Sequence, residues 1–361
     1  MSQKGKITVY QAMLLFITAT YTPAVRLISS VTSKEAKQAA WLTPFISFIL
    51  FIILIFIIHS IYRKYKDVSF MDAIYDIMGS FLGKIIVFLY LITLIILLAL
   101  YFRYFAERLA MSIYPHADIN FFIIVMLGVV GITLRHGIVN IARMNEIILP
   151  FITVIFILLS LLLLPNIKIE NLTPISYKDI LPVFNASFSV TAIWVYVLFV
   201  FFIGDKIKNK EEIKSYGIKT GAFLLVYTVL MIVTSVGVEG YSIIARAPLS
   251  YFIVIRDVSI FGIIERVESI LIATWLLSDF IIISVFSYII LELLKSLFNF
   301  NDAKPLVNVF IILLYFLTFY LAINVFELGA YSEKFAIPSN VIFGLVIPCI
   351  IWGVGKVRRK V

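Results

Sequence analysis

Two acidic residues and a tryptophan are the side chains best placed to do chemistry inside an apolar helix of this chain. Glu268, Trp275 and Asp279 are spaced seven and four residues apart, so at roughly 100° per residue they share one helix face. An ionised carboxylate surrounded by lipid is costly. Asp279 therefore needs either a structural partner on another helix or a proton, a cation or a substrate amine. Glu268 is expected to have a structural or gating role near the outer membrane surface.

Two clusters of hydroxyl-bearing side chains occupy comparable positions in two other apolar segments. Their members are Thr18, Thr20, Tyr21 and Thr22 before Pro23, and Ser187, Ser189 and Thr191 after Pro182. Pro23 removes a backbone donor and disfavours helix at the preceding residue, so carbonyl groups one turn back are freed. The matching positions predict two interrupted helices with a small polar substrate bound between them. The alternative is that each hydroxyl bonds a carbonyl of its own helix.

A further polar stretch lies in the outer half of the apolar segment that begins near residue 84. Tyr101 and Tyr104 are candidates for lining a pocket, because a phenol combines an apolar body with one polar tip. They could equally anchor the helix at the membrane surface. Arg103 and Glu107 are four residues apart, so they can pair along the helix. We expect that pair to be structural or gating.

The remaining ionisable residues suggest no catalytic or metal site. Arg143 and Glu146 form a polar cluster at the inner end of the fifth segment, either as an inner gate or as a snorkelling arginine with a local carboxylate. His59 and His136 have no companion at metal-ligand spacing, and Cys349 is the only cysteine. No nucleophile, zinc or phosphate-loop motif is present. The sequence therefore favours a protein that is not an enzyme and needs no metal or cofactor.

The elements that must position these side chains are membrane-spanning helices. The chain is 62% hydrophobic and has a mean hydropathy of +1.07, and about 20 apolar residues suffice to cross a bilayer. The apolar runs lack the alternation of a barrel, so the predicted class is an all-α integral membrane protein. Ten spans are expected, beginning near residues 8, 39, 84, 120, 138, 177, 218, 266, 304 and 337.

Ten spans divide into two sets of five with opposite orientation. We expect a single transmembrane domain over residues 1–361, with repeats at 8–165 and 177–355 and a LeuT-like arrangement whose first and sixth helices are discontinuous. The net charge of +9 could suggest nucleic acid, but most Lys and Arg residues fall on one side of the predicted membrane. The positive-inside rule places both termini in the cytoplasm. The apolar stretch after the N-terminal lysines lacks a cleavage site, so it is expected to remain as the first helix.

Several short motifs resemble those of the bacterial spore-germination permeases, the B subunits of nutrient germinant receptors. Residues 265–268 (ERVE) followed by Trp275 are similar to the family's ERxE…W pattern. Arg143, Glu146 and Pro150 resemble its R…E…P stretch, and residues 171–174 (NLTP) resemble its NLxP connector. Trp41 at the start of the second span also fits. The chain departs from the family at Tyr21, where relatives often carry small glycines.

This resemblance implies an amino-acid/polyamine/organocation-type fold and residence in the spore inner membrane. It also implies assembly with a larger membrane subunit and a lipoprotein subunit, and sensing of small nutrients, often amino acids. Two hypotheses follow: a nutrient-sensing receptor subunit, or a proton- or cation-coupled amino-acid transporter on the same scaffold that uses Asp279. A role limited to scaffolding its partners ranks below both.

Overall fold

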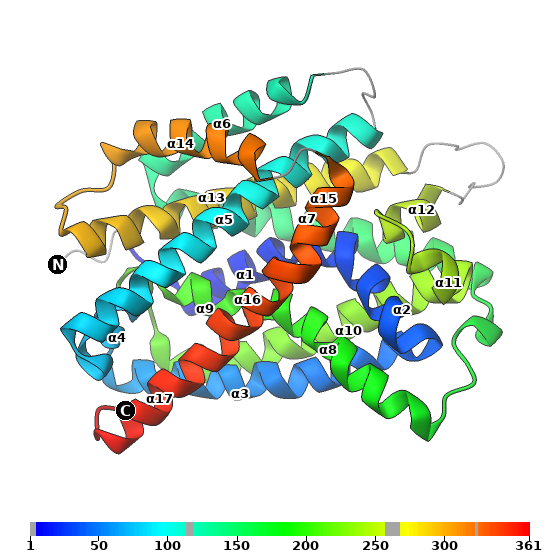
Figure 1. Cartoon of the computed structure of the whole chain (residues 1–361), viewed down its shortest axis with the longest axis horizontal. Coiled ribbons are helices and arrows are strands. Elements are labelled where there is room, and N and C mark those ends of the chain that lie inside the picture. Colours follow the sequence, from blue (N-terminus) through cyan, green and yellow to red (C-terminus); the bar gives the residue numbers. More distant parts are fainter. Residues whose placement is uncertain (1–4, 113–117, 257–267, 322–323) are drawn as a thin grey trace.

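The computed structural model describes residues 5–112, 118–256, 268–321 and 324–361, except for the side chains of Glu268, Val325 and Phe326. The described chain is a bundle of helices with one two-residue strand pair (Figure 1). The helices are α1 (Val9–Pro23), α2 (Ser29–Ala36), α3 (Thr43–Lys64), α4 (Phe70–Met78), α5 (Ser80–Ser112), α6 (Ile119–His136), α7 (Ile138–Leu163), α8 (Ile180–Trp194), α9 (Tyr196–Phe201), α10 (Ile213–Glu239), α11 (Tyr241–Ile244), α12 (Ser250–Arg256), α13 (Glu268–Phe298), α14 (Leu306–Tyr320), α15 (Val325–Tyr331), α16 (Ile337–Val341) and α17 (Ile347–Val357).

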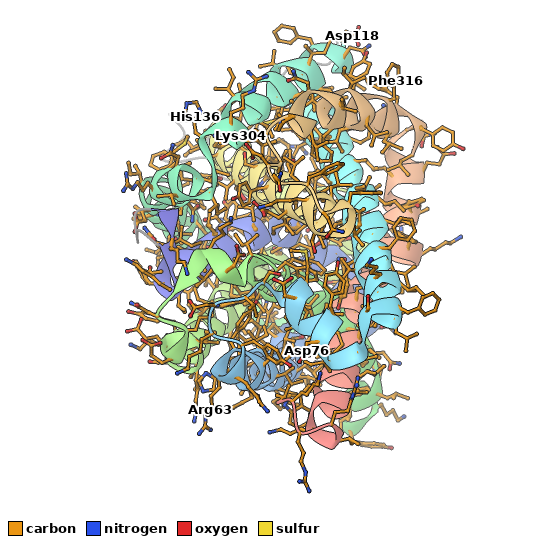
Figure 2. All side chains as sticks on the ribbon, turned by 90° about the vertical axis from the view of Figure 1, so that its left-hand side faces the viewer. Arg63, Asp76, Asp118, His136, Lys304 and Phe316 are labelled. Atoms are coloured by element: carbon orange, nitrogen blue, oxygen red, sulfur yellow. The ribbon has the colours of Figure 1, made fainter. Side chains whose placement is uncertain are left out.

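Eight helical stretches of the described chain are long and apolar enough to cross a membrane. One of them, Val9–Lys64, reverses direction at the 3-10 turn Lys37–Leu42, so it supplies two crossings (Figure 1). The shorter apolar helix α14 supplies another. Together these make the ten predicted spans. Large apolar side chains such as Ile147 and Phe316 are exposed, as lipid contact requires. Figure 2 shows Phe316 at the side of the bundle.

The first crossing changes its helical form after Pro23. Thr8 and Gln11 form a capping box that starts α1, and the Ala24 N–H donates to the carbonyl oxygens of both Thr20 and Tyr21. Residues Ala24–Ile28 then form a π-helical turn before α2 begins at Ser29. A π turn is a rare insertion that often marks a functional site. The predicted irregularity is therefore present, although it takes the form of a widened turn that follows the threonine cluster.

The sixth crossing bends at Val195. Helix α8 ends at Trp194 and α9 begins at Tyr196, with the Val195 N–H still bonded to the Thr191 carbonyl oxygen. Ser187, Ser189 and Thr191 all lie within regular helix before this bend. Each of the two predicted irregularities therefore lies nearer the C-terminus than the hydroxyl cluster that suggested it.

Helix α1 lies in the centre of the bundle, in contact with α13, α7, α9 and α10. The segment before it, β1 (Ile7–Thr8), pairs in parallel with β2 (Ile207–Lys208), the segment that follows α9. This pairing ties the first and sixth crossings together at one end of the bundle. Lys6 pairs with Asp67, and Lys64 donates to the Arg359 carbonyl oxygen, so the start of β1 and the C-terminus lie at the same end, as an even number of crossings requires.

That end of the molecule is basic. A surface hollow of about 1090 Å³ separates β2 from the end of α3. Its cationic lining residues are Lys6, Arg63, Lys66, Lys206, Lys208 and Lys210. Figure 2 views the bundle from this end, with Arg63 and Asp76 labelled. The basic end matches the side that the sequence assigns to the cytoplasm, and that assignment stays a prediction.

Candidate functional site

A buried ion pair joins α5 to α13 beside the C-terminal end of α1. Arg108 on α5 donates to the Asp279 carboxylate, and the side chains are only 3% and 2% exposed. The Arg108 guanidinium lies 4.9 Å from the centroid of the Trp275 ring, and the Thr22 hydroxyl lies beside both the Trp275 carbonyl oxygen and Asp279. Of the alternatives that the sequence left open for Asp279, the structure supplies the structural partner on another helix.

The π-helical turn places a second arginine in the core. The Arg26 guanidinium carbon lies 3.2 Å from the centroid of the Tyr104 ring, and the residue is 7% exposed. Among the hydrogen bonds and ion pairs between described residues, none involves this guanidinium. The Tyr104 hydroxyl contacts the Leu328 carbonyl oxygen and the Ser332 hydroxyl, both at 2.7 Å. Ser332 begins a further π-helical turn, Ser332–Ala336, so two π turns face each other across Tyr104.

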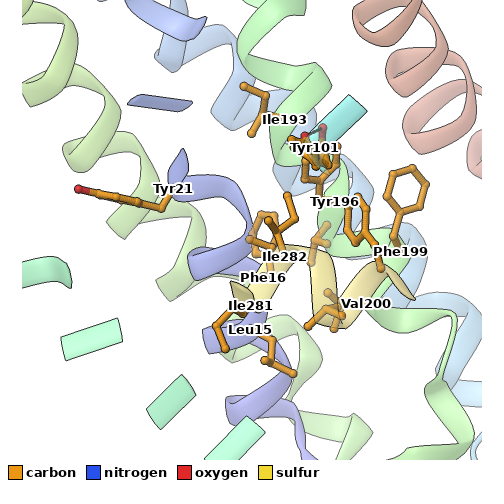
Figure 3. Close-up of a cluster of buried hydrophobic side chains, with 14 of the residues drawn as sticks. Leu15, Phe16, Tyr21, Tyr101, Ile193, Tyr196, Phe199, Val200, Ile281 and Ile282 are labelled. Carbon is orange, nitrogen blue, oxygen red and sulfur yellow. Dashed lines mark hydrogen bonds between the residues drawn. The ribbon is translucent and has the colours of Figure 1, made fainter. Parts of the chain in front are cut away.

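Two small hollows lie on different sides of α1. The first, of about 10 Å³, is bordered by Thr20, Tyr21 and Tyr227, with mostly apolar neighbours. The second, of about 20 Å³, is lined by apolar residues such as Leu97 and Ile193 together with polar ones; the polar lining residues are Arg26, Tyr101, Tyr104, Tyr196, Ser332 and Asn340. Figure 3 shows Tyr21 pointing away from Tyr101 and Tyr196. A water molecule needs about 10–15 Å³, so each of these two hollows has room only for water.

The second hollow is edged by a chain of hydrogen bonds. The Tyr101 and Tyr196 hydroxyls bond each other, and Asn340 Nδ2 donates to the Tyr196 hydroxyl at 3.0 Å. Asn340 Oδ1 is buried with no partner among the described residues. A buried carbonyl oxygen without a donor is costly. The hollow therefore offers one cation, whose described contact is the Tyr104 ring, and one acceptor that has no donor among the described residues.

Most of the predicted hydroxyls bond carbonyl groups of their own helix. Thr18 donates to the Leu14 carbonyl oxygen, Thr20 to that of Ile17, Ser187 to that of Phe184 and Thr191 to that of Ser187. Ser189 is buried and borders neither hollow. Neither hollow is bordered by members of both clusters. The single pocket expected between the clusters stays a prediction.

Of the other predicted site residues, Tyr21 bonds Thr274 on α13, with the hydroxyl oxygens 2.9 Å apart. Trp275 and Asp279 share the helix face expected of them, since both contact Arg108. The side chain of Glu268 lies outside the described residues.

The remaining charged residues of the prediction lie farther from the hollows. The pairing of Arg103 with Glu107 is confirmed at 2.7 Å. Arg143 is exposed, and Glu146 accepts a hydrogen bond from Gln11 at 3.2 Å. The roles assigned to these residues in structure or gating stay predictions.

Three residues that line the second hollow were not predicted from the sequence: Arg26, Tyr196 and Asn340. Arg26 carried a usable signal, because any charge within an apolar span suggests a functional position. Tyr196 and Asn340 carried none, since their convergence depends on how α9 and α16 pack. Across residues 5–112, 118–256, 268–321 and 324–361, no group of three or more His, Cys, Asp or Glu side chains could hold a metal ion.

The family model and the two similar curated proteins all point to the same protein family. A family described as "Spore germination protein" matches residues 6–326. Spore germination protein YndE of Bacillus subtilis (strain 168) is 25% identical over 287 residues, which cover 77% of each chain. The putative spore germination protein YfkT of the same organism is 24% identical over 351 residues, covering 96% of this chain and 95% of the other.

Two solved structures share the fold. Mhp1, a nucleobase-cation-symport-1 family transporter in a closed conformation with bromovinylhydantoin bound, superposes with a TM-score of 0.71 at 14% identity, covering 99% of this chain and 80% of the other. MhsT in complex with L-phenylalanine gives 0.69 at 13% identity, covering 96% and 88%. These likenesses confirm the predicted all-α, LeuT-like membrane fold. The residue boundaries of the two repeats, 8–165 and 177–355, stay a prediction.

Proposed function

The chain belongs to the spore germination protein family, and from that premise we propose that it is the germinant-sensing membrane subunit of a spore nutrient receptor. It binds a small polar nutrient, with amino acids as the expected class, near the middle of the membrane. It then signals to a larger membrane subunit and a lipoprotein subunit in the spore inner membrane. Both termini face the spore core, in keeping with the positive-inside rule.

One observation carries the proposal: the polar hollow beside the π turn Ala24–Ile28. The turn places Arg26 among Tyr101, Tyr196 and Asn340 inside the bundle. Buried polar groups that lack partners are costly, and a ligand that satisfies them recovers that cost. The two solved relatives in fold each hold a small ligand, which supports use of the same scaffold for nutrient binding.

Sensing follows from the size of the hollow. At about 20 Å³ it must expand to admit an amino acid, which is several times larger than a water molecule. A nutrient that binds only the expanded form shifts the population toward it. The outer ion pair Lys34–Glu333 joins α2 to the π turn Ser332–Ala336, so expansion moves these segments apart. That movement is what a partner subunit would detect.

The experiment is a thermal-shift screen of the purified full-length chain against the twenty standard amino acids, followed by calorimetry on each compound that stabilises it. We expect Asn340→Ala to weaken binding at least tenfold. Thr18→Val, which removes a hydroxyl bonded within α1, should leave binding unchanged. The opposite pattern would place the nutrient in the pocket predicted from the hydroxyl clusters. Absence of binding by every compound would refute the proposal.

A proton- or cation-coupled amino-acid transporter is the second candidate. The transporter fold of the solved relatives favours it, whereas the engagement of Asp279 by Arg108 weighs against Asp279 as a coupling site. Reconstituted vesicles test the two candidates against each other. Uptake of the bound amino acid driven by a proton or sodium gradient would establish transport. Binding without uptake would favour the sensing role over transport.

A further inference from the structure

The charges buried in the core of the described chain do not balance. The buried charged residues are Arg26, Arg103, Arg108, Lys210 and Asp279. Arg103 pairs with Glu107, and Arg108 pairs with Asp279. Lys210 lies at the basic end, where it donates to the Lys66 carbonyl oxygen. Arg26 remains with an aromatic ring as its described contact. The cluster of Arg26, Arg108 and Asp279 therefore carries a net charge of +1 in the interior of the bundle.

A cation in such a place normally has a carboxylate within reach. Asp279 is within electrostatic range of Arg26, but its carboxylate already accepts a hydrogen bond from Arg108, whose guanidinium lies over Trp275. Arg108 also has one nitrogen, Nη1, that is buried without a partner among the described residues. The described protein therefore has more guanidinium donors here than it has acceptors.

Arg26 lines the second hollow, where its guanidinium could bind an anion. Its guanidinium carbon lies over the Tyr104 ring, 3.2 Å from the ring centroid, and none of the hydrogen bonds between described residues uses its N–H groups. A guanidinium edge matches the two oxygens of a carboxylate. The π turn supplies this position, because Arg26 is the third residue of Ala24–Ile28.

From these contacts we infer that Arg26 binds the carboxylate of the ligand, so that the nutrient is a small monocarboxylate such as an amino acid. One negative charge brings the cluster to neutrality. Asn340 Oδ1, the unsatisfied acceptor on the same hollow, receives an amine or hydroxyl group of the ligand. Asp279 does not bind the ligand amine. This inference rests on the proposed function and names the chemistry of the same site.

The test compares matched compounds on the purified full-length chain by calorimetry. Each amino acid that binds is set against its carboxamide and against the amine left by removing the carboxyl group. We expect the wild-type chain to bind the acid at least tenfold more tightly than either analogue. Equal affinity for the acid and the carboxamide would overturn the inference and leave the proposed nutrient binding intact. If no acid binds, both fail.

Variants of Arg26 give a second test. Arg26→Gln should lose at least tenfold in affinity for the acid and lose the preference over the carboxamide, while Arg26→Lys should keep part of that preference. Arg63→Gln removes a cation from the exposed basic end and should bind as the wild type does. Undiminished acid binding by Arg26→Gln would contradict the inference. Were that variant to fail to fold, the comparison of acid and carboxamide on the wild-type chain would still decide.

Discussion

Replacing Asp279 by leucine should destabilise the protein more than replacing its partner Arg108 by methionine. Both side chains are almost completely buried, and breaking a buried pair from one side costs about 3–5 kcal/mol. Asp279→Leu leaves the Arg108 guanidinium without its carboxylate, so the cluster of Arg26 and Arg108 then carries two uncompensated positive charges. Its effect should therefore reach the upper end of that range. Arg108→Met leaves Asp279 within electrostatic range of Arg26, so its effect should fall at the lower end or below.

The double variant separates pairing from general damage to the core. With both charges removed and the space filled by apolar groups, stability should return to within about 1 kcal/mol of the wild type. Unfolding in mixed micelles with an increasing fraction of denaturing detergent gives the free energy of unfolding of the wild type, the two single variants and the double variant. A coupling free energy of at least about 2 kcal/mol is expected. Additive losses would refute the pairing, and equal losses in the two single variants would refute the charge imbalance assigned to Arg26.

Three further predictions concern the two helix irregularities and the C-terminus. Gly344→Ala should destabilise the protein by about 1–3 kcal/mol, because its new Cβ would lie 2.4 Å from Val195 Cβ at the bend of the sixth crossing; detergent unfolding measures this. Pro23→Ala restores a backbone donor, so the amides of Ala24–Ile28 should exchange hydrogen more slowly in mass spectrometry. The hydrogen bonds that Asp76 accepts from Lys360 and Tyr65 lower the pKa of its carboxyl group below the ordinary 3.8. The carboxylate therefore stabilises the folded C-terminus above that pKa, and a spin label at the last residue should become more mobile as the pH falls below it.

Each of these predictions has a matched control. Gly128→Ala adds a methyl group where no atom lies within 4 Å and should keep or slightly raise stability, so an equal loss at both glycines would contradict the steric argument. For the proline variant, exchange in α10 should stay as in the wild type. Asp76→Asn should make the spin label mobile at neutral pH and insensitive to acid. A label that stays immobile in that variant would show that the Lys360 contact does not hold the C-terminus.

The helices of this fold were predictable because lipid allows few alternatives. Apolar runs of sufficient length must form helices, and the ten predicted spans agree with the observed crossings. Pro23 also marked the first irregularity, since a missing N–H has a local effect on the helix. Val195 carried no such signal. Its bend follows from how α8 and α9 pack, and the nearby serines suggested a break too early in the chain.

The candidate site was harder to predict because it depends on distant parts of the chain. Arg108 and Asp279 are 171 residues apart, so a periodic pattern could place Asp279 on a helix face without identifying its partner. The threonine and serine hydroxyls had two possible uses, and helix carbonyls satisfied most of them. Arg26 was visible as a charge in an apolar span, but only the packing of Tyr104 and Asn340 around it distinguishes a site from a structural contact.

The most direct measurement is an experimental structure of the full-length chain with a bound amino acid, at a resolution that shows the orientation of the ligand. The account predicts density beside the π turn Ala24–Ile28, with the ligand carboxylate on Arg26 and its amine toward Asn340, and with the Arg108–Asp279 pair intact. Density in the hollow beside Tyr21, or a ligand amine bonded to an Asp279 released from Arg108, would contradict it.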